Sequence, residues 1–338
     1  MKKNTKALIP AILVLLLANV VFAKAAVVLH ELQEPGFLAV DDNQLYIVES
    51  PGIYIYSLKG FKFKNKFGKA GSGPGEFDTA VPISVDISTG NIIVNSTGKV
   101  SFFSKEGVFK KELKVNNVGR TFFQPLKGGY AAEDVAFVNN YAFAAVHLFD
   151  ARLNKVKEIF RYDIPAVRNG KIDLLHQSAL FSIYENKLFI AAMKALTIKV
   201  FDHTGQHLYS IQYPKEYKNR RFTAADEKGF RGFLRLKLGE EYQQTKDSLA
   251  FPEYWPAAAG FMVTDKKVYV ITWKRKAGRT EFVIFDRKGK LLKQAYFPFA
   301  LRGPLTVYPW TIKKAKLYQL IKERDTGKWQ IHVTGLGL

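Results

Sequence analysis

The stretch FGKAGSGPGEF, residues 67–77, is the part of the chain whose residue types come nearest to a phosphate-binding loop. Its glycines alternate at Gly71, Gly73 and Gly75, but Glu76 occupies the position of the third glycine in a dinucleotide-binding loop. The segment that follows, PISVDISTGNIIVN, alternates apolar and polar residues as a strand does. Since no helix N-terminus would face the anion, the glycines do not predict a phosphate site.

The histidines give no pattern typical of a metal site or of nucleophilic catalysis. His203 and His207 are four residues apart, but they flank a predicted hairpin turn, and zinc needs three or four converging ligands. We find no nucleophile elbow and no Ser/His/Asp order. The sequence therefore predicts no catalytic residue, no metal site and no cofactor. It gives no such role to any of the six histidines, His30, His147, His176, His203, His207 and His332.

Five tight turns recur along the chain, each after an aromatic residue. In these turns an Asp or Ser side chain accepts a hydrogen bond from a backbone N–H two residues on, and glycine supplies positive φ where the turn closes. We therefore interpret Asp150, Asp202 and Asp286 as turn-forming residues. The turns read YSLKG (56–60), FSKEG (103–107), FDARLN (149–154), FDHTG (201–205) and FDRKG (285–289).

Strand-like segments precede these turns, and a sixth lies near the end of the chain. When Leu45, Ile92, Ala142, Leu188, Val268 and Leu317 are taken as equivalent, the steps are 47, 50, 46, 80 and 49 residues. A repeat of about 40–50 residues with four strands is typical of a β-propeller blade. The sequence predicts an all-β fold, a six-bladed β-propeller with an insertion between blades four and five.

The two ends of the chain predict how the ring closes. The sixth unit lacks an outermost strand, while the segment Ala26–Glu34 precedes the first blade and has the pattern of an outer strand. Pairing of this N-terminal outer strand with Trp329–Val333 would close the ring and remove an open sheet edge. In such a ring the glycine-rich stretch joins blades one and two, with Phe77 between them.

Residues 67–113 resemble the repeat of the NHL-type six-bladed β-propellers. They share a glycine-rich lead-in ending in Phe77, the strand start at Val85-Asp86, and the turn that closes at Gly107. The proline-flanked segment 251–270 is similar to the start of a blade in exported bacterial propellers of this kind. The resemblance is close over one blade and covers the others by pattern, since blades three, four and six lack the lead-in.

Propellers bind ligands at one face, around the central channel, with the loops between strands and blades. Aromatic and arginine side chains in these loops are common in ligand sites. The alternative is that aromatic residues such as Phe122, Trp255 and Trp310 wedge the blades together. The candidate ligand-binding residues are Arg120, Phe122, His176, Tyr254, Trp255, Arg302, Tyr308 and Trp310.

The insertion, about residues 214–256, interrupts the strand rhythm. Its segment GEEYQQTKDSL (239–249) is interpreted as a helix, and FRGFLRLK (230–237) alternates apolar and basic residues. The insertion could cap the channel, dock on a partner, or cover the side of blade five.

Residues 1–25 have the order of a secretory signal peptide: lysines at positions 2, 3 and 6, an apolar run, then Ala23 and Ala25 as alternative cleavage sites. We expect an exported protein, periplasmic or extracellular, with a mature propeller over residues 26–338. We expect no integral membrane segment after cleavage, and a monomer. The chain has no cysteine, so its stability depends on its core.

The formal charge of the 338-residue chain is +21, and removal of Lys2, Lys3, Lys6 and Lys24 lowers it to +17. Such a charge attracts anionic surfaces. We therefore expect a non-catalytic binding or scaffold protein that recognises a protein or an anionic envelope polymer, with weak, non-specific polyanion binding. The alternative is a metal-dependent lyase or hydrolase whose ligands come from several blades around the channel. The cations of the predicted outer strands are Lys62, Lys64 and Lys66, which should share one face, then Lys110, Lys111, Lys114, Lys155, Lys157 and Arg161.

Overall fold

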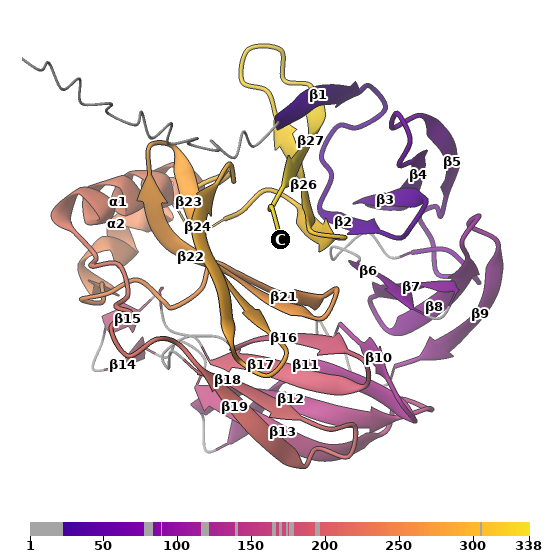
Figure 1. Cartoon of the computed structure of the whole chain (residues 1–338), viewed down its shortest axis with the longest axis horizontal. Coiled ribbons are helices and arrows are strands. Elements are labelled where there is room, and N and C mark those ends of the chain that lie inside the picture. The colour runs from indigo at the N-terminus through magenta and orange to yellow at the C-terminus, as the bar shows by residue number, and fades with distance from the viewer. Residues whose placement is uncertain are drawn as a thin grey trace, which may run out of the picture.

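The strands of the computed structural model form six four-stranded antiparallel sheets arranged in a ring, so the fold is the predicted six-bladed β-propeller (Figure 1). The chain runs around the ring blade by blade, and the last blade lies beside the first. The described residues are 23–77, 84–88, 90–115, 122–138, 141–163, 167–168, 171–173, 175, 179–192, 197–304 and 306–338. The predicted signal segment up to Phe22 lies outside them.

In blades one to three the four strands follow chain order across the sheet. Blade one holds β2 (Phe37–Val40), β3 (Gln44–Glu49), β4 (Gly52–Ser57) and β5 (Phe63–Phe67). Blade two holds β6 (Ser84–Ser88), β7 (Asn91–Ser96), β8 (Lys99–Ser104) and β9 (Phe109–Lys114). Blade three holds β10 (Gln124–Leu126), β11 (Gly129–Val138), β12 (Tyr141–Asp150) and β13 (Lys155–Asp163).

The second half of the ring follows the same order. Blade four holds β16 (Ala179–Tyr184), β17 (Lys187–Ala192), β18 (Thr197–Phe201) and β19 (His207–Gln212). Blade five holds β21 (Gly260–Thr264), β22 (Lys267–Lys276), β23 (Arg279–Asp286) and β24 (Leu291–Phe297). Blade six holds β25 (Trp310–Lys313), β26 (Lys316–Lys322), β27 (Trp329–Gly335) and, from the N-terminal end of the chain, β1 (Ala23–Leu29).

The first strands of the blades line the centre of the ring. Strand β2 contacts β25 and β6, β21 contacts β16 and β25, and β10 contacts β16. Because the strands of a blade alternate in direction, the two ends of the ring carry different loops. We call the end with the connections between blades the insertion face, and the end with the first-to-second and third-to-fourth strand turns the turn face.

The predicted turn chemistry is confirmed. Asp150, Asp202 and Asp286 each accept hydrogen bonds through Oδ1 from the backbone N–H groups two and four residues on, at 2.8–2.9 Å. The aromatic residue before each of these turns is buried. These aspartates therefore shape the turn face.

The glycine-rich stretch is a connection that lets blades one and two pack closely. A Cβ on Gly68, whose φ is +83°, would lie 2.3 Å from the Phe77 ring. Phe77 is fully buried between the two blades, where its ring centroid is 5.8 Å from that of Phe103. Glu76 accepts a hydrogen bond from the Gly73 N–H and pairs with Lys69 at 2.9 Å. The acidic side chain thus occupies the loop that would have to hold a phosphate.

The third blade differs from the prediction. The second strand is β11, in which Tyr130 pairs with Phe149 as Leu45 pairs with Tyr56 in blade one. The segment around Ala142 therefore belongs to the third strand, and its assignment as equivalent to Leu45 was wrong. The acidic pair Glu133-Asp134 interrupts the apolar alternation of β11, so the sequence does not indicate a strand there. In the structure Tyr162 and Lys155 are the partners of the two carboxylates.

The N-terminal strand lies at the outer edge of the last blade. Strand β1 pairs antiparallel with β27, with Val27 opposite Ile331 and Leu29 opposite Trp329. It spans Ala23–Leu29 rather than the predicted Ala26–Glu34, because the chain leaves the sheet at residue 30 to reach β2. The Trp329 indole N–H donates to the Gln33 carbonyl at 2.6 Å, so this exit also satisfies a buried donor.

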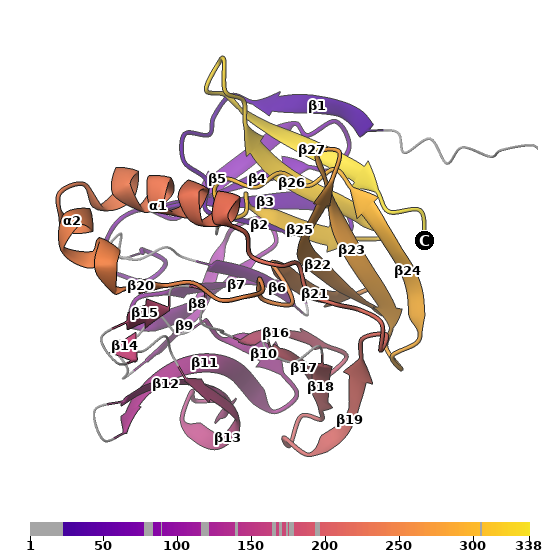
Figure 2. The same ribbon diagram turned by 90° about the vertical axis from the view of Figure 1, so that its left-hand side faces the viewer.

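The insertion forms a small helical layer beside a three-stranded sheet on the insertion face (Figure 2). Its main helix, α1 (Ala224–Leu238), begins with a capping box in which Thr223 and Asp226 satisfy each other's backbone N–H groups. The expected helix at 239–249 is reduced to α2 (Glu241–Thr245) and a 3-10 turn (Lys246–Ser248), while FRGFLRLK lies in α1. The sheet consists of β14 (Val167–Arg168), β15 (Lys171–Asp173) and β20 (Leu249–Ala250).

Candidate functional site

Of the eight predicted ligand-binding residues, Arg120 and His176 lie outside the described residues. Phe122 packs edge-on against Phe37 of β2, with ring centroids 5.9 Å apart. Because Phe37 begins blade one and Phe122 leads into blade three, the two rings meet across the inner end of blade two. Phe122 therefore lies beside the channel on the insertion face, half-buried.

Trp255 joins the insertion to blade five. It is 4% exposed, and its ring stacks on Trp273 of β22 at a centroid distance of 4.7 Å. Its indole N–H donates to Asp226 at 3.3 Å, and Phe230 of α1 completes the same buried cluster. Tyr254, the neighbouring candidate, is 44% exposed. Trp255 thus packs the insertion onto blade five, a contact other than the blade-to-blade wedge that the sequence left open, whereas Tyr254 is exposed to solvent.

Arg302 and Tyr308 lie on the connection from blade five to blade six, and Trp310 begins β25. The Arg302 guanidinium and the Tyr308 ring both approach Trp329, at centroid distances of 5.9 Å. Trp310 packs against Phe299 instead. Arg302 pairs with Glu34 at 3.0 Å, and a hydrogen bond from Lys322 holds the pKa of the Glu34 carboxyl below its usual range. The structure therefore brings Arg302 and Tyr308 together, but the Arg302 charge is compensated.

The hairpin formed by β22 and β23 carries four cations on the insertion face. Its two-residue turn, Ala277-Gly278, has positive φ at both positions, as a tight hairpin requires. Strand β22 has ten residues against six in β3, so the hairpin extends farther than its counterpart in blade one. The Trp255–Trp273 stack supports its base. We call this element the basic hairpin; its cations are Lys274, Arg275, Lys276 and Arg279.

Only one cation of the basic hairpin has a carboxylate partner among the described residues. Lys274 lies 3.7 Å from the Tyr217 ring centroid and 3.9 Å from the carboxylate of Glu281, a buried residue. Glu281 also accepts hydrogen bonds from Thr272, Tyr217 and Gln294. A buried carboxylate with four partners holds the start of the insertion against blade five. Arg275, Lys276 and Arg279 are exposed and form no salt bridge with any described residue.

A cavity of about 240 Å³ opens between blades five and six, next to the basic hairpin. Gln319 is fixed within it by two hydrogen bonds to the Ala300 backbone, at 2.8 and 2.9 Å. Burial lowers the pKa of the His332 imidazole and thereby favours its neutral form. We call this cavity the blade 5–6 cleft; its lining is Arg275, Gly278, Pro298, Phe299, Ala300, Leu317, Gln319, Ile321, His332, Val333 and Thr334.

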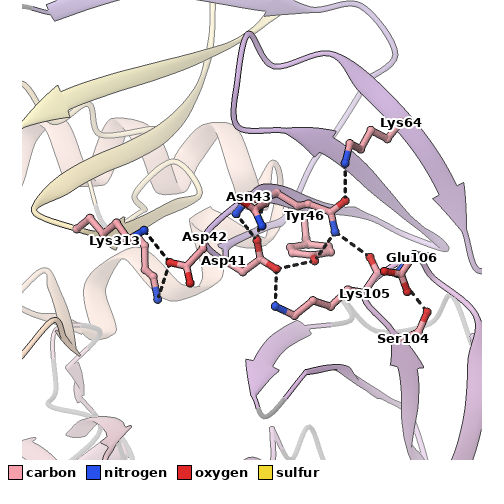
Figure 3. Close-up of polar contacts among 11 residues, drawn as sticks. Asp41, Asp42, Asn43, Tyr46, Lys64, Ser104, Lys105, Glu106 and Lys313 are labelled. Carbon is pink, nitrogen blue, oxygen red and sulfur yellow. Dashed lines mark hydrogen bonds and ion pairs between the residues drawn. The ribbon is translucent and has the colours of Figure 1, made fainter.

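The turn face has a different charge arrangement, in which cations meet carboxylates across blade boundaries (Figure 3). Asp41 accepts hydrogen bonds from two backbone N–H groups and from the Tyr46 hydroxyl, and pairs with Lys105 of the next blade at 3.0 Å. Asp42 pairs with Lys314 of blade six at 3.0 Å. These contacts join blades six, one and two. Their charges are used in holding the ring together.

Of the nine cations that the sequence placed on the outer strands of blades one to three, eight lie in β5, β9 and β13 and Lys62 lies just before β5; all nine are exposed. Two of them are compensated, since Lys155 pairs with Asp134 and Arg161 with Glu158. Several others contact neutral groups: Lys64 binds the Gln44 amide oxygen, Lys66 the Tyr54 hydroxyl and Lys110 the Asn91 amide oxygen. We call the set without a salt bridge to any described residue the rim lysines: Lys62, Lys64, Lys66, Lys110, Lys111, Lys114 and Lys157.

The expectation that Lys62, Lys64 and Lys66 project from one face was wrong. A β-bulge between the pairs Ile55–Asn65 and Tyr56–Phe63 interrupts the alternation at Lys64. Lys66 consequently lies over the Tyr54 ring, whereas Lys64 reaches Gln44, which itself donates to the Lys105 carbonyl of blade two. The cations are spread over both sides of the outer strand.

The innermost strand of blade two carries an acidic residue, Asp86, without a charged partner among the described residues. Asp86 lies on β6, while Val85 and Ile87 on either side of it point into the core between blades one and two. Burial raises the pKa of the Asp86 carboxyl to about 6. Elsewhere in the described part of the chain, no three His, Asp or Glu side chains gather as a metal site would require. His203 and His207 flank the β18–β19 turn as expected.

The comparisons agree with the architecture. A family model described as a 6-bladed beta-propeller, DUF5128, matches residues 30–228. The chain belongs to this family. The match does not extend to the NHL type, so that finer resemblance stays a prediction. No curated protein is similar enough in sequence to count as a match.

Two solved structures have a similar fold. A candidate exported protein of Bacteroides fragilis aligns with a TM-score of 0.54 at 13% identity, over 88% of this chain and 89% of its own. A member of the duf4221 family from Bacteroides vulgatus aligns with a TM-score of 0.52 at 11% identity, over 93% of this chain and 97% of its own. At these identities the likeness concerns the fold alone. The described helices include none with the length and apolar character needed to cross a membrane.

Proposed function

We propose that this propeller is an exported, non-catalytic binding protein whose partner is an anionic polymer of the cell envelope. The observation that carries the proposal is the set of rim lysines, whose contacts are with neutral groups. Export is inferred from the signal-peptide pattern of residues 1–25. A protein partner is the other possibility that the sequence raised, and the test below separates the two.

The contrast with the turn face supports an anionic partner. There Asp41 and Asp42 neutralise Lys105 and Lys314, so these lysines have little charge left to offer. A cation beside an amide oxygen or a phenol keeps its full charge. The seven rim lysines, none of which has a salt bridge to a described residue, would together give a positive surface that concentrates polyanions without selecting a base or a sugar.

The test compares polymer binding by two variants that lose the same charge. The rim variant is Lys64→Gln, Lys110→Gln and Lys111→Gln; the control is Lys215→Gln, Lys228→Gln and Lys237→Gln, three exposed lysines of the insertion. We expect the wild-type protein to bind polyphosphate and polygalacturonate at about 50 mM salt and to release them by about 200 mM. The slope of log affinity against log salt should fall by about two in the rim variant and stay unchanged in the control.

Two results would overturn the proposal. Equal losses in both variants would mean that net charge alone attracts the polymers. Recovery of a stoichiometric protein from an envelope extract, with binding indifferent to salt, would replace the polymer by a protein partner.

A further inference from the structure

The blade 5–6 cleft is a built cavity that the rim lysines do not explain, since it lies on another part of the ring. Its inner wall is fixed: Phe299 is 2% exposed, Leu317 1% and Gln319 2%. The Gln319 amide accepts a hydrogen bond from the Ala300 N–H and donates one to the Ala300 carbonyl. It therefore cannot turn outward without breaking both hydrogen bonds. The cavity is thus preformed.

The chemistry of the lining differs from end to end. Pro298, Phe299, Leu317 and Ile321 supply apolar walls, whereas Arg275 is exposed and is the one fully charged side chain in the lining. A guanidinium without a carboxylate partner binds a planar carboxylate or a phosphate through two parallel hydrogen bonds. The lining therefore suits a small molecule that is anionic at one end and apolar along one side.

The size of the cavity limits the ligand. Pockets for drug-sized molecules usually have volumes of about 300–1,000 Å³, and the cleft has about 240 Å³. One sugar or polyol unit bearing a carboxylate or phosphate would fill it, whereas a polymer segment of several units would not.

We propose that the blade 5–6 cleft binds a single anionic unit, a uronic acid or a polyol phosphate, with Arg275 holding the anion at the mouth. The inference rests on the proposed function only for the source of that unit, which would be the end of an anionic polymer. The rim lysines then gather the polymer, and the cleft selects its terminus.

The basic hairpin supplies a matched control for Arg275. Lys276 is the next residue, is exposed like Arg275, and has no salt bridge with any described residue, but it does not line the cleft. Arg275→Ala and Lys276→Ala therefore remove the same charge from the same hairpin. Because both side chains are exposed, both variants should fold, and far-UV circular dichroism checks this.

The experiment titrates each variant calorimetrically with galacturonate and glycerol 3-phosphate at 150 mM salt, with galactose and glycerol as neutral probes. We expect the wild-type protein to bind at least one of the anions and neither neutral probe. Affinity should fall about tenfold or more in Arg275→Ala and less than about twofold in Lys276→Ala. The imidazole NMR signal of His332 is assigned with His332→Gln. It should shift on ligand addition in the wild-type protein and stay in place in Arg275→Ala.

Distinct results would overturn the inference or change its source. Equal losses in the two variants, binding of the neutral probes, or a silent His332 signal at saturating anion would each refute the cleft as an anion site. Short galacturonate oligomers that bind clearly more weakly than the monomer would point to a free small anion, because a polymer end must be able to enter the cleft with its next unit attached. Polymer binding that persists in the rim variant, together with monomer binding that is lost in Arg275→Ala, would overturn the proposed function and leave the cleft in place.

Discussion

The neighbours of a charged residue in this propeller decide whether it holds the fold together or is free to bind a ligand. Asp41 and Lys105 hold each other across a blade boundary, and Glu281 is surrounded by donors in the core of blade five. Arg275 has the same kind of charge as Lys274, one position earlier, but points to the other side of the strand and meets no described carboxylate. The residue type alone does not distinguish these cases.

Asp86 gives a pH dependence whose sign follows from its pKa. Burial raises this pKa to about 6, above its ordinary value of 3.8. The folded protein therefore binds the proton more tightly than the unfolded chain, and stability falls as the pH rises from about 4 through 6. Asp86→Asn removes this cost. In urea unfolding at pH 7.5 we expect the variant to be more stable than the wild-type protein by about 1–3 kcal/mol, and to match it near pH 4.

A turn aspartate provides the control with the opposite sign. A hydrogen bond from the Thr204 hydroxyl, with others from the backbone, holds the pKa of Asp202 below its usual range. Asp202→Asn should therefore lower stability at pH 7.5, with the difference disappearing as the pH falls below about 4. If Asp86→Asn also lowered stability at pH 7.5, the carboxylate would have a stabilising partner and the argument from burial would be wrong.

At the scale of elements, the sequence predicted what local chemistry determines. Aspartate turns, the number of blades and the burial of Phe77 all follow from short patterns. The third blade was misread because Glu133 and Asp134 interrupt the apolar alternation of β11, and their partners lie on β13. The bulge at Lys64 and the separate sides of Lys274 and Arg275 depend on strand pairing, which no short pattern encodes.

The candidate site was predicted only in part for the same reason. Arg302 and Tyr308 do meet on the insertion face. The cleft, however, forms between β22 on one side and β26 and β27 on the other, and about 40 residues of sequence separate β22 from β26. Its clearest sequence signal is the run WKRKAGR (273–279), four cations around an Ala-Gly turn without an acidic residue. That run predicts an exposed basic hairpin, whereas the cavity beside it needs the packed ring.

Strand β1 predicts how the ring depends on its closure. Leu29 is 2% exposed and packs with Leu320 and Ile331, whereas Ala26, on the same strand, is exposed. Leu29→Asp places a charge in that core, so we expect it to lower the free energy of unfolding by about 3 kcal/mol or more and to promote aggregation through the freed edge of β27. Ala26→Asp should stay within about 0.5 kcal/mol of the wild-type protein. Equal stability of the two variants in urea would show that β1 is dispensable for the ring.

The net charge of the chain predicts opposite effects of salt on polyanion binding and on folding stability. A formal charge of +21, or +17 without the four N-terminal lysines, makes the folded ring repel itself. Salt screens this repulsion, but it also weakens exposed ion pairs such as Lys314–Asp42. Exposed pairs contribute about 0–1 kcal/mol each, and the seven rim lysines have no such pair among the described residues. The repulsion should therefore dominate.

We accordingly expect the melting temperature to rise between 20 and 200 mM sodium chloride, over the range in which polyanion binding is lost. The accompanying gain in the free energy of unfolding should be about 1 kcal/mol, the magnitude of a few exposed charge interactions. The rim variant Lys64→Gln, Lys110→Gln and Lys111→Gln should be more stable than the wild-type protein at 20 mM salt and should show a smaller rise, because it begins with less repulsion. A melting temperature that falls with salt would mean that the ion pairs of the turn face outweigh the repulsion among the rim lysines, which would then be too far apart to act as one surface.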